Sequence, residues 1–132
     1  MTKTAVVFAS GITHNTKTVA EYISGNIDSD LFDLKAVDPD ISSYDNVVIG
    51  TGIHAGKIYK QVEAFVRKNK DVLAKKNVSL FLMCLYNDSK GDRQLKAISD
   101  KLGIEDSRYF NMKDAPKGGV PPAVDDFIKG LV

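Results

Sequence analysis

The sequence contains a single cysteine and no tryptophan. Cys84 alone cannot form an internal disulfide or supply a cysteine-rich metal site. There is also no His-x-x-His pattern and no carboxylate cluster that would suggest a metal. The first residues lack the apolar core of a signal peptide, and no apolar run is long enough to span a membrane. We therefore expect a cytoplasmic protein without a membrane span.

The sequence has no large excess of charge of either sign. Its 18 Lys and Arg residues against 17 Asp and Glu residues give a net charge of +1. This balance argues against strong attraction to nucleic acid or to an acidic surface. A chain of 132 residues is long enough for one sizeable core. We expect a single domain over residues 1–132 that works as a monomer.

Short apolar runs alternate with amphipathic stretches along the chain. The runs lie at residues 4–9, 30–36, 46–50, 78–84 and 108–112. Apolar residues at helical spacing occur within residues 19–27, 62–73, 95–102 and 124–131, and Gly103 is placed to end the third of these helices. Alternating strands and helices predict right-handed crossovers and a parallel sheet. The expected fold is a doubly wound α/β domain, with helices on both faces of a five-stranded parallel sheet.

Missing residues exclude three functions found on such folds. A phospho-accepting receiver domain needs acidic residues after its first and third strands, where this chain has Ala9-Ser10 and Gly50-Thr51. The Gly-x-Ser-x-Gly turn of a serine hydrolase is absent. A nucleoside-triphosphate loop ends in Gly-Lys-Ser/Thr, which is also absent. These three classes are therefore set aside.

The segment between the first predicted strand and the first predicted helix is rich in hydrogen-bonding side chains. It reads Ser10-Gly11-Ile12-Thr13-His14-Asn15-Thr16. A strand that leads through such a turn into a helix presents free N–H groups and the positive end of a helix dipole. This predicts a binding site for a monophosphate. The alternative is an ordinary turn in which Asn15 or Thr16 caps the helix.

Two further loops are expected beside this one. They follow the third and fourth predicted strands and contain residues 51–57 and 85–91. In a doubly wound sheet, ligands bind at the carboxyl ends of the strands, near the point where the strand order reverses. The three loops are therefore expected to form one site.

Together the three loops resemble those of flavodoxins. Residues 48–57, Val-Ile-Gly-Thr-Gly-Ile-His-Ala-Gly-Lys, followed by Phe65-Val66-Arg67-Lys68-Asn69, are closer to flavodoxin domains of the menaquinone-dependent protoporphyrinogen oxidase type. The resemblance implies a three-layer flavodoxin-like fold with strand order 2-1-3-4-5 and FMN as the cofactor. The residues that match the three loops, and that it implies as FMN contacts, are Ser10, Gly11, Ile12, Thr13, His14, Asn15, Thr16, Thr51, Gly52, Ile53, His54, Ala55, Gly56, Cys84, Leu85, Tyr86, Asn87 and Asp88.

Two positions of this resemblance lead to specific expectations. His14 stands where flavodoxins usually have glycine, so its φ is expected to be positive. Its side chain is expected either to donate to the phosphate or to lie in solvent. The flavin ring needs an aromatic or apolar face. Tyr86 is the expected stacking residue, with Ile53 or His54 on the other face and Tyr59 as a weaker alternative.

Two functions in different classes follow from the resemblance. The first is a carrier that shuttles single electrons between redox enzymes and docks on them transiently. The alternative is an FMN-dependent oxidoreductase of the protoporphyrinogen oxidase type, acting on an organic substrate or a quinone. The short segment from Lys113 to Val120 favours the carrier, whereas the near-neutral charge differs from the acidic character usual in flavodoxins. A module on the same fold that binds no flavin is the third possibility.

Overall fold

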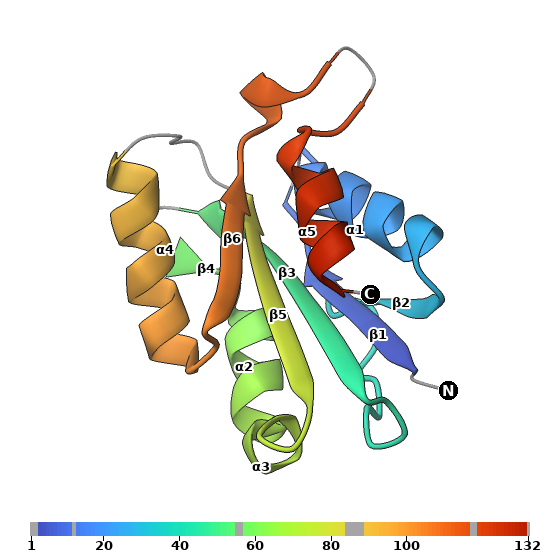
Figure 1. The fold of residues 1–132 in the computed structure, drawn as a ribbon. Coiled ribbons are helices and arrows are strands. Elements are labelled where there is room, and N and C mark those ends of the chain that lie inside the picture. Colours follow the sequence, from blue (N-terminus) through green and yellow to red (C-terminus); the bar gives the residue numbers. More distant parts are fainter. Residues whose placement is uncertain (1–2, 12, 55–56, 84–88, 117–118, 132) are drawn as a thin grey trace.

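A five-stranded parallel sheet forms the centre of the molecule (Figure 1). The computed structural model describes residues 3–11, 13–54, 57–83, 89–116 and 119–131. The parallel strands are β1 (Thr4–Ala9), β2 (Ser29–Asp33), β3 (Asn46–His54), β5 (Asn77–Met83) and β6 (Asp106–Phe110). They lie in the order β2-β1-β3-β5-β6, and β4 (Lys57–Ile58) pairs antiparallel with the end of β3. Counting the parallel strands alone, this is the predicted order 2-1-3-4-5.

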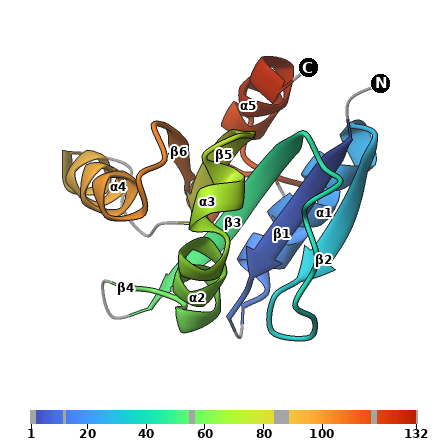
Figure 2. The ribbon, with the colours of Figure 1, turned by 90° about the horizontal axis from the view of Figure 1, so that it is seen from below.

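Helices cover both faces of the sheet. They are α1 (Asn15–Asn26), α2 (Lys60–Lys68), α3 (Lys70–Leu73), α4 (Ser89–Leu102) and α5 (Ala123–Leu131), with a 3₁₀ turn η1 (Met112–Asp114). The core on one face joins the sheet to α2, α3 and α4, and the core on the other joins it to α1 and α5. Figure 2 shows α2 and α5 on opposite sides of the strands. The predicted three-layer α/β architecture is therefore confirmed.

The central strands are buried because both of their faces are apolar. In β1, Ala5 and Val7 point into the core beneath α2, while Val6 and Phe8 point into the core beneath α1. This alternation places consecutive side chains on opposite faces of one strand. Every residue from Ala5 to Ala9 is buried. Hydrophobic burial on two faces is what keeps β1 between its neighbours.

Three phenylalanines close the core beneath α5. The Phe110 and Phe127 rings meet edge to face with centroids 5.7 Å apart, and the Phe81 and Phe127 rings are 6.2 Å apart. Such edge-to-face pairs stabilise by about 0.5–1.5 kcal/mol beyond their burial. At the surface of this layer, the Tyr22 hydroxyl of α1 donates to Asp125 of α5 over 2.6 Å. The pKa of Tyr22 is raised, chiefly by this hydrogen bond to a carboxylate.

Several predicted boundaries differ from those observed. The second strand ends at Asp33 instead of residue 36, because Asp33 Oδ1 accepts the Lys35 N–H (2.9 Å) and turns the chain. The last strand begins and ends two residues earlier than predicted. The helix predicted within residues 62–73 is divided at Asn69 into α2 and α3. Gly103 does end α4, with φ +71° and its N–H bonded to Ser99 O (2.8 Å).

None of the helices formed by the described residues has the length and apolar character needed to cross a bilayer.

Candidate functional site

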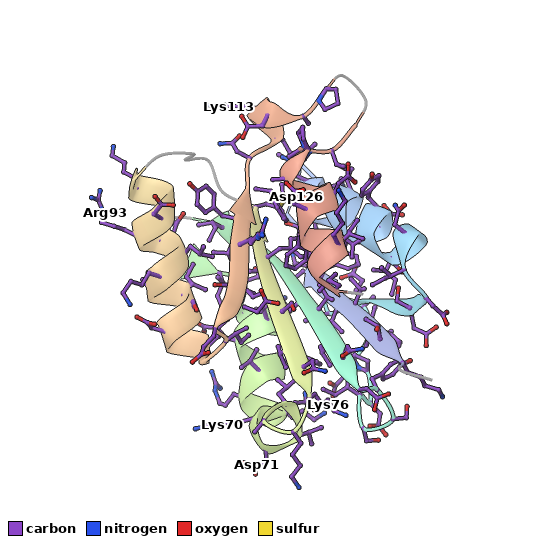
Figure 3. All side chains as sticks on the ribbon, in the orientation of Figure 1. Lys70, Asp71, Lys76, Arg93, Lys113 and Asp126 are labelled. Carbon is purple, nitrogen blue, oxygen red and sulfur yellow. The ribbon has the colours of Figure 1, made fainter. Side chains whose placement is uncertain are left out.

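The carboxyl ends of the parallel strands meet at one edge of the sheet, the upper edge in Figure 1. The helices that follow β1 and β5 begin there. Figure 3 places Arg93 of α4 and Lys113 of η1 at this edge, and Lys70, Asp71 and Lys76 at the opposite one. The candidate site lies where the segment 10–16 meets the end of β3.

His14 sets the geometry of the first loop. Its φ of 57° and ψ of 20° place it in the left-handed region, as expected for a residue at a glycine position. Its N–H donates to Gly11 O (3.1 Å), and its carbonyl accepts from the Thr18 N–H (2.9 Å) and the Thr18 hydroxyl (3.0 Å). The exposed imidazole makes no capping hydrogen bond. The alternative that Asn15 or Thr16 caps α1 is wrong, because both are the first residues of the helix itself.

Ser10 satisfies one donor of the helix start. Its Oγ accepts the Lys17 N–H over 3.3 Å. Asn15 and Thr16 are the first residues of α1, so their N–H groups have no acceptor within the helix. Neither N–H group donates a hydrogen bond to any other described residue. Two backbone donors at the positive end of α1 are thus available to an anion.

Thr16 brings the first loop into contact with the end of β3. This residue is buried, with a relative exposure of 2%. A Cβ added at Gly52 would lie 3.1 Å from Thr16 Oγ1, so glycine at position 52 allows this approach. In the part of the chain that the structure describes, the Thr16 hydroxyl makes no hydrogen bond. A hydroxyl without a partner in the protein can donate to or accept from a ligand.

The segment predicted as the second loop is largely a hairpin. β3 continues through His54, and Ile53 and His54 pair with Ile58 and Lys57 of β4. The prediction of an open loop over residues 51–57 was therefore wrong for its described part. The cause is a tertiary contact, because the buried Thr51 hydroxyl accepts the Tyr59 N–H (3.4 Å) and draws the returning chain against β3. The same hydroxyl donates to Gly52 O (2.9 Å), so both of its hydrogen-bonding functions serve the fold.

The remaining predicted contacts fall partly outside the described residues. Ile53 is half-buried and packs against the core beneath α2. Ser10 and Gly11 are half-buried, and Thr13 is exposed. The predicted site residues Ile12, Ala55, Gly56, Cys84, Leu85, Tyr86, Asn87 and Asp88 lie outside the described residues. The proposed stacking of Tyr86 on a flavin stays a prediction.

Tyr59 occupies the junction between the first loop and the end of β3. A Cβ at Gly11 would lie 2.1 Å from the Tyr59 hydroxyl oxygen, and one at Gly52 would lie 3.0 Å from Tyr59 Cε2. Both glycines therefore make room for this ring. From the sequence, Tyr59 is only a weaker alternative for covering the flavin ring, because it is expected to begin the second helix. It immediately precedes α2 and lies at the site.

Lys35 also lies at the candidate site, although the sequence did not predict it there. Its Nζ donates to Ser10 O (2.6 Å) and lies 4.3 Å from the centroid of the Tyr59 ring. No local pattern marks Lys35, which is 25 residues from Ser10 in sequence. Only the strand order could have predicted this contact, because parallel pairing of β2 with β1 brings the chain after β2 to the carboxyl end of β1.

A further donor without a partner in the described part of the chain lies at the carboxyl end of β6. The side chain of Asn111 is buried, and its Oδ1 accepts the Lys113 N–H (2.9 Å). Its Nδ2 has no hydrogen-bond partner among the described residues. Sequence reasoning did not mark this position, because an isolated asparagine after a strand is common in turns.

A hollow of about 300 Å³ lies away from this site, at the amino ends of β1, β3 and β5 beside the end of α5. Its polar side chains bond to one another. Asn77 donates to Asn46 (3.0 Å), Asn46 donates to Thr4 (3.3 Å), and Ser79 donates to Asp106 (2.5 Å). Because these polar groups satisfy one another, the hollow offers a ligand few open hydrogen-bonding groups. The donors of Asn15, Thr16 and Asn111 that have no partner among the described residues lie instead at the carboxyl ends of the strands. The described residues contain no group of three side chains suited to a metal ion.

The profile of a family described as a flavodoxin domain matches residues 6–113. An uncharacterized protein of Methanocaldococcus jannaschii is 31% identical over 80 residues, which cover 59% of this chain and 51% of that protein. The match thus spans about half the length of this curated relative.

Solved structures agree with the fold. The oxidised flavodoxin 1 of Bacillus cereus is similar with a TM-score of 0.64 and 18% identity, over 98% of this chain and 94% of that chain. A Fusobacterium nucleatum flavodoxin bound to flavin mononucleotide is similar with a TM-score of 0.57 and 15% identity, over 92% of this chain and 76% of that chain. At these identities the likeness shows the fold alone. With the family profile matching most of its length, the chain belongs to the flavodoxin domain family.

Proposed function

We propose that this chain binds one FMN at the carboxyl edge of its sheet and carries single electrons between redox enzymes. In this proposal it is a cytoplasmic monomer that docks transiently on its partners. Bound FMN would supply the redox chemistry, and the chain's residues would bind and orient it. Membership of the flavodoxin domain family and the similar fold of a Fusobacterium nucleatum flavodoxin bound to flavin mononucleotide support the proposal.

The observation that carries the proposal is the set of unused donors at the start of α1. The N–H groups of Asn15 and Thr16 and the hydroxyl of Thr16, a buried residue, have no partner among the described residues. Gly11 leaves room for the Tyr59 ring beside this loop, and Ser10 and Thr13 add hydroxyls nearby. This donor set suits the terminal phosphate of FMN, which is anionic and accepts several hydrogen bonds. The residues present therefore fit the cofactor's phosphate.

The flavin ring would lie over the ends of β3 and β5. In this proposal Gly52 and Ile53 flank one face of the ring, and residues 84–88, with Tyr86, flank the other. FAD is expected to bind less well, because a loop that closes on a terminal phosphate leaves no path for an adenylate.

The direct test is a titration of the purified apoprotein with FMN, followed by quenching of flavin fluorescence. We expect saturation at about one FMN per chain and a yellow protein. A colourless protein that leaves FMN fluorescence unquenched would contradict the proposal and favour a flavin-free interaction module.

The alternative function is an FMN-dependent oxidoreductase of the protoporphyrinogen oxidase type. The near-neutral net charge of +1 favours it over a carrier that docks through an acidic surface. Steady-state assays with protoporphyrinogen and with a quinone separate the two. Turnover of either compound by the FMN-loaded protein would support the oxidoreductase, and its absence alongside rapid electron exchange with redox proteins would support the carrier.

A further inference from the structure

We infer that Lys35 is a phosphate-binding residue that supplies the full positive charge which segment 10–16 lacks. The inference rests on the proposed function, since the anion it concerns is the FMN phosphate. Segment 10–16 contains hydroxyls, amides and one histidine, but no lysine or arginine. Lys35 comes from the turn after β2 and reaches this segment from outside it.

The geometry holds the Lys35 ammonium at the first loop. Nζ donates to Ser10 O over 2.6 Å and lies 4.3 Å from the centroid of the Tyr59 ring. An ammonium has three N–H donors, and one of them is used by the Ser10 carbonyl. The Tyr59 ring contacts Nζ through its face and lies against Gly11 and Gly52. The ammonium is thus placed beside the backbone that an anion would approach.

The charge on Lys35 is not neutralised within the described residues. Lys68 and Lys101 pair with Asp38 and Glu63, whereas Nζ of Lys35 contacts a carbonyl and an aromatic ring. The neighbouring Asp33 carboxylate accepts the Lys35 backbone N–H instead. A lysine held by neutral partners keeps its full charge for an anionic ligand.

The start of α1 likewise has no carboxylate that would neutralise its positive end. Its first turn contains no acidic residue and includes Lys17, whereas the first turns of α2 and α4 contain Glu63 and Asp92. A carboxylate in the first turn would compete with an anion for the positive helix end. A second observation indicates a ligand: Thr16 lies at this helix end with a relative exposure of 2%, and its hydroxyl makes no hydrogen bond to the described residues.

A phosphate monoester carries a charge of about −1.5 to −2 at neutral pH. The helix end contributes a partial charge of about +0.5, which leaves most of the negative charge uncompensated. Lys35 adds one full positive charge. Its effect is expected to depend on ionic strength, because the side chain is exposed.

The first experiment compares the binding of FMN and riboflavin, which differ in the phosphate. Lys35→Gln retains a hydrogen-bond donor for Ser10 O and removes the charge. We expect it to weaken FMN binding about fivefold at low salt, with little change at high salt and none for riboflavin. Lys35→Arg should keep most of the affinity. Lys113→Gln, at the same edge of the sheet (Figure 3), is the matched control and should bind FMN as the unaltered protein does.

Two results of this experiment would overturn the inference. An equal loss for FMN and riboflavin would mean that Lys35 only supports the loop through Ser10. Unchanged FMN binding in Lys35→Gln would mean that its charge does not reach the phosphate, while leaving the proposed function intact.

The second experiment needs no flavin. Inorganic phosphate is titrated into the apoprotein at constant ionic strength, and the amide signals of Asn15 and Thr16 are followed by NMR. We expect saturable shifts that require severalfold more phosphate in Lys35→Gln. If FMN fails to bind but these shifts depend on Lys35, the anion site stands and the proposed function fails. Identical phosphate titrations for the two proteins would overturn the role of Lys35.

Discussion

His14 is the only non-glycine residue with positive φ among the described residues. For an L-residue this conformation costs about 1–2 kcal/mol, and histidine is among the side chains found there more often than most. The strain is located in the loop that would bind the phosphate, between Gly11 and the first turn of α1. It fixes the direction in which the amides of that turn point.

Replacing His14 with glycine should relieve this strain. We expect His14→Gly to raise the free energy of unfolding of the apoprotein by about 0.5–1 kcal/mol, because part of the gain is offset by the greater freedom of glycine when unfolded. Urea denaturation measures the change. His14→Ala keeps the strained conformation and should bring no gain. A lower stability in His14→Gly would show that the imidazole makes a stabilising interaction.

Thr16 gives the residue-scale test of the phosphate contact. Removing a hydroxyl that bonds to a charged acceptor costs about 1.5–3 kcal/mol, so Thr16→Ala should weaken FMN binding roughly tenfold to a hundredfold. Riboflavin affinity should hardly change, and Thr16→Ser should restore most of the FMN affinity. Both ligands are measured by fluorescence quenching. A matching loss for riboflavin would assign Thr16 to packing against Gly52.

Two glycines should respond in opposite ways to alanine. A Cβ at Gly50 would lie 2.1 Å from Phe81 Cζ within the core, whereas one at Gly25 of α1 meets nothing within 4 Å. Gly50→Ala should lower the free energy of unfolding by about 1–3 kcal/mol through overpacking. Gly25→Ala should raise it by about 0.8–1 kcal/mol through helix propensity. Equal effects in chemical denaturation would contradict this packing at Gly50.

At the scale of elements, the apolar pattern predicted the sheet well. Runs that are apolar on both faces, such as 78–84, could only be central strands, and their order followed from the family resemblance. The hairpin of β3 and β4 could not be predicted, because its small residues read as a loop. It depends on the contact of Thr51 with Tyr59, which forms only in the folded chain.

The candidate site also contains residues that the sequence predicted and residues that it did not. The donors of segment 10–16 are close in sequence, so their chemistry was visible in the pattern. Lys35 was not, because a charged residue in an exposed turn is ordinary and only the pairing of β1 with β2 brings it to Ser10. Contacts between neighbouring strands depend on register, which a local pattern does not contain.

The contact between β2 and the segment before β3 gives a pH-dependent prediction. The Tyr44 hydroxyl donates to the Asp30 carboxylate over 2.5 Å, which raises the pKa of Tyr44 from its ordinary value of 10.0 to about 12. The pKa of Tyr44 is higher in the folded protein than in the unfolded chain. The Tyr44–Asp30 hydrogen bond therefore contributes fully to the free energy of unfolding below pH 10, and this contribution is lost as the pH rises through about 12. Unfolding free energies across this range should fall more in the unaltered protein than in Tyr44→Phe. Parallel pH profiles would contradict the assignment, and absorbance of ionised tyrosine gives a second measurement.

At the scale of the whole molecule, we propose that residues 1–132 unfold as one cooperative unit. The same strands contribute side chains to the cores on both faces of the sheet. Loss of the helices from either face would therefore expose apolar residues of these strands. Circular dichroism and aromatic fluorescence should report the same transition. FMN at about a hundredfold excess over its dissociation constant should add about 2.7 kcal/mol to the free energy of unfolding. Two separated transitions would contradict a single domain.

The position of β1 between β2 and β3 has a consequence for the nascent chain. β1 is synthesised before both strands that flank it, β2 and β3, and a hydrogen bond between Tyr22 and Asp125 links α1 to α5. Until Phe127 has been synthesised, the Phe81 and Phe110 rings have no cover from α5. We therefore expect a nascent chain that ends before α5 to leave these two aromatic rings uncovered on this side, and exposed apolar surface of this kind is what chaperones bind.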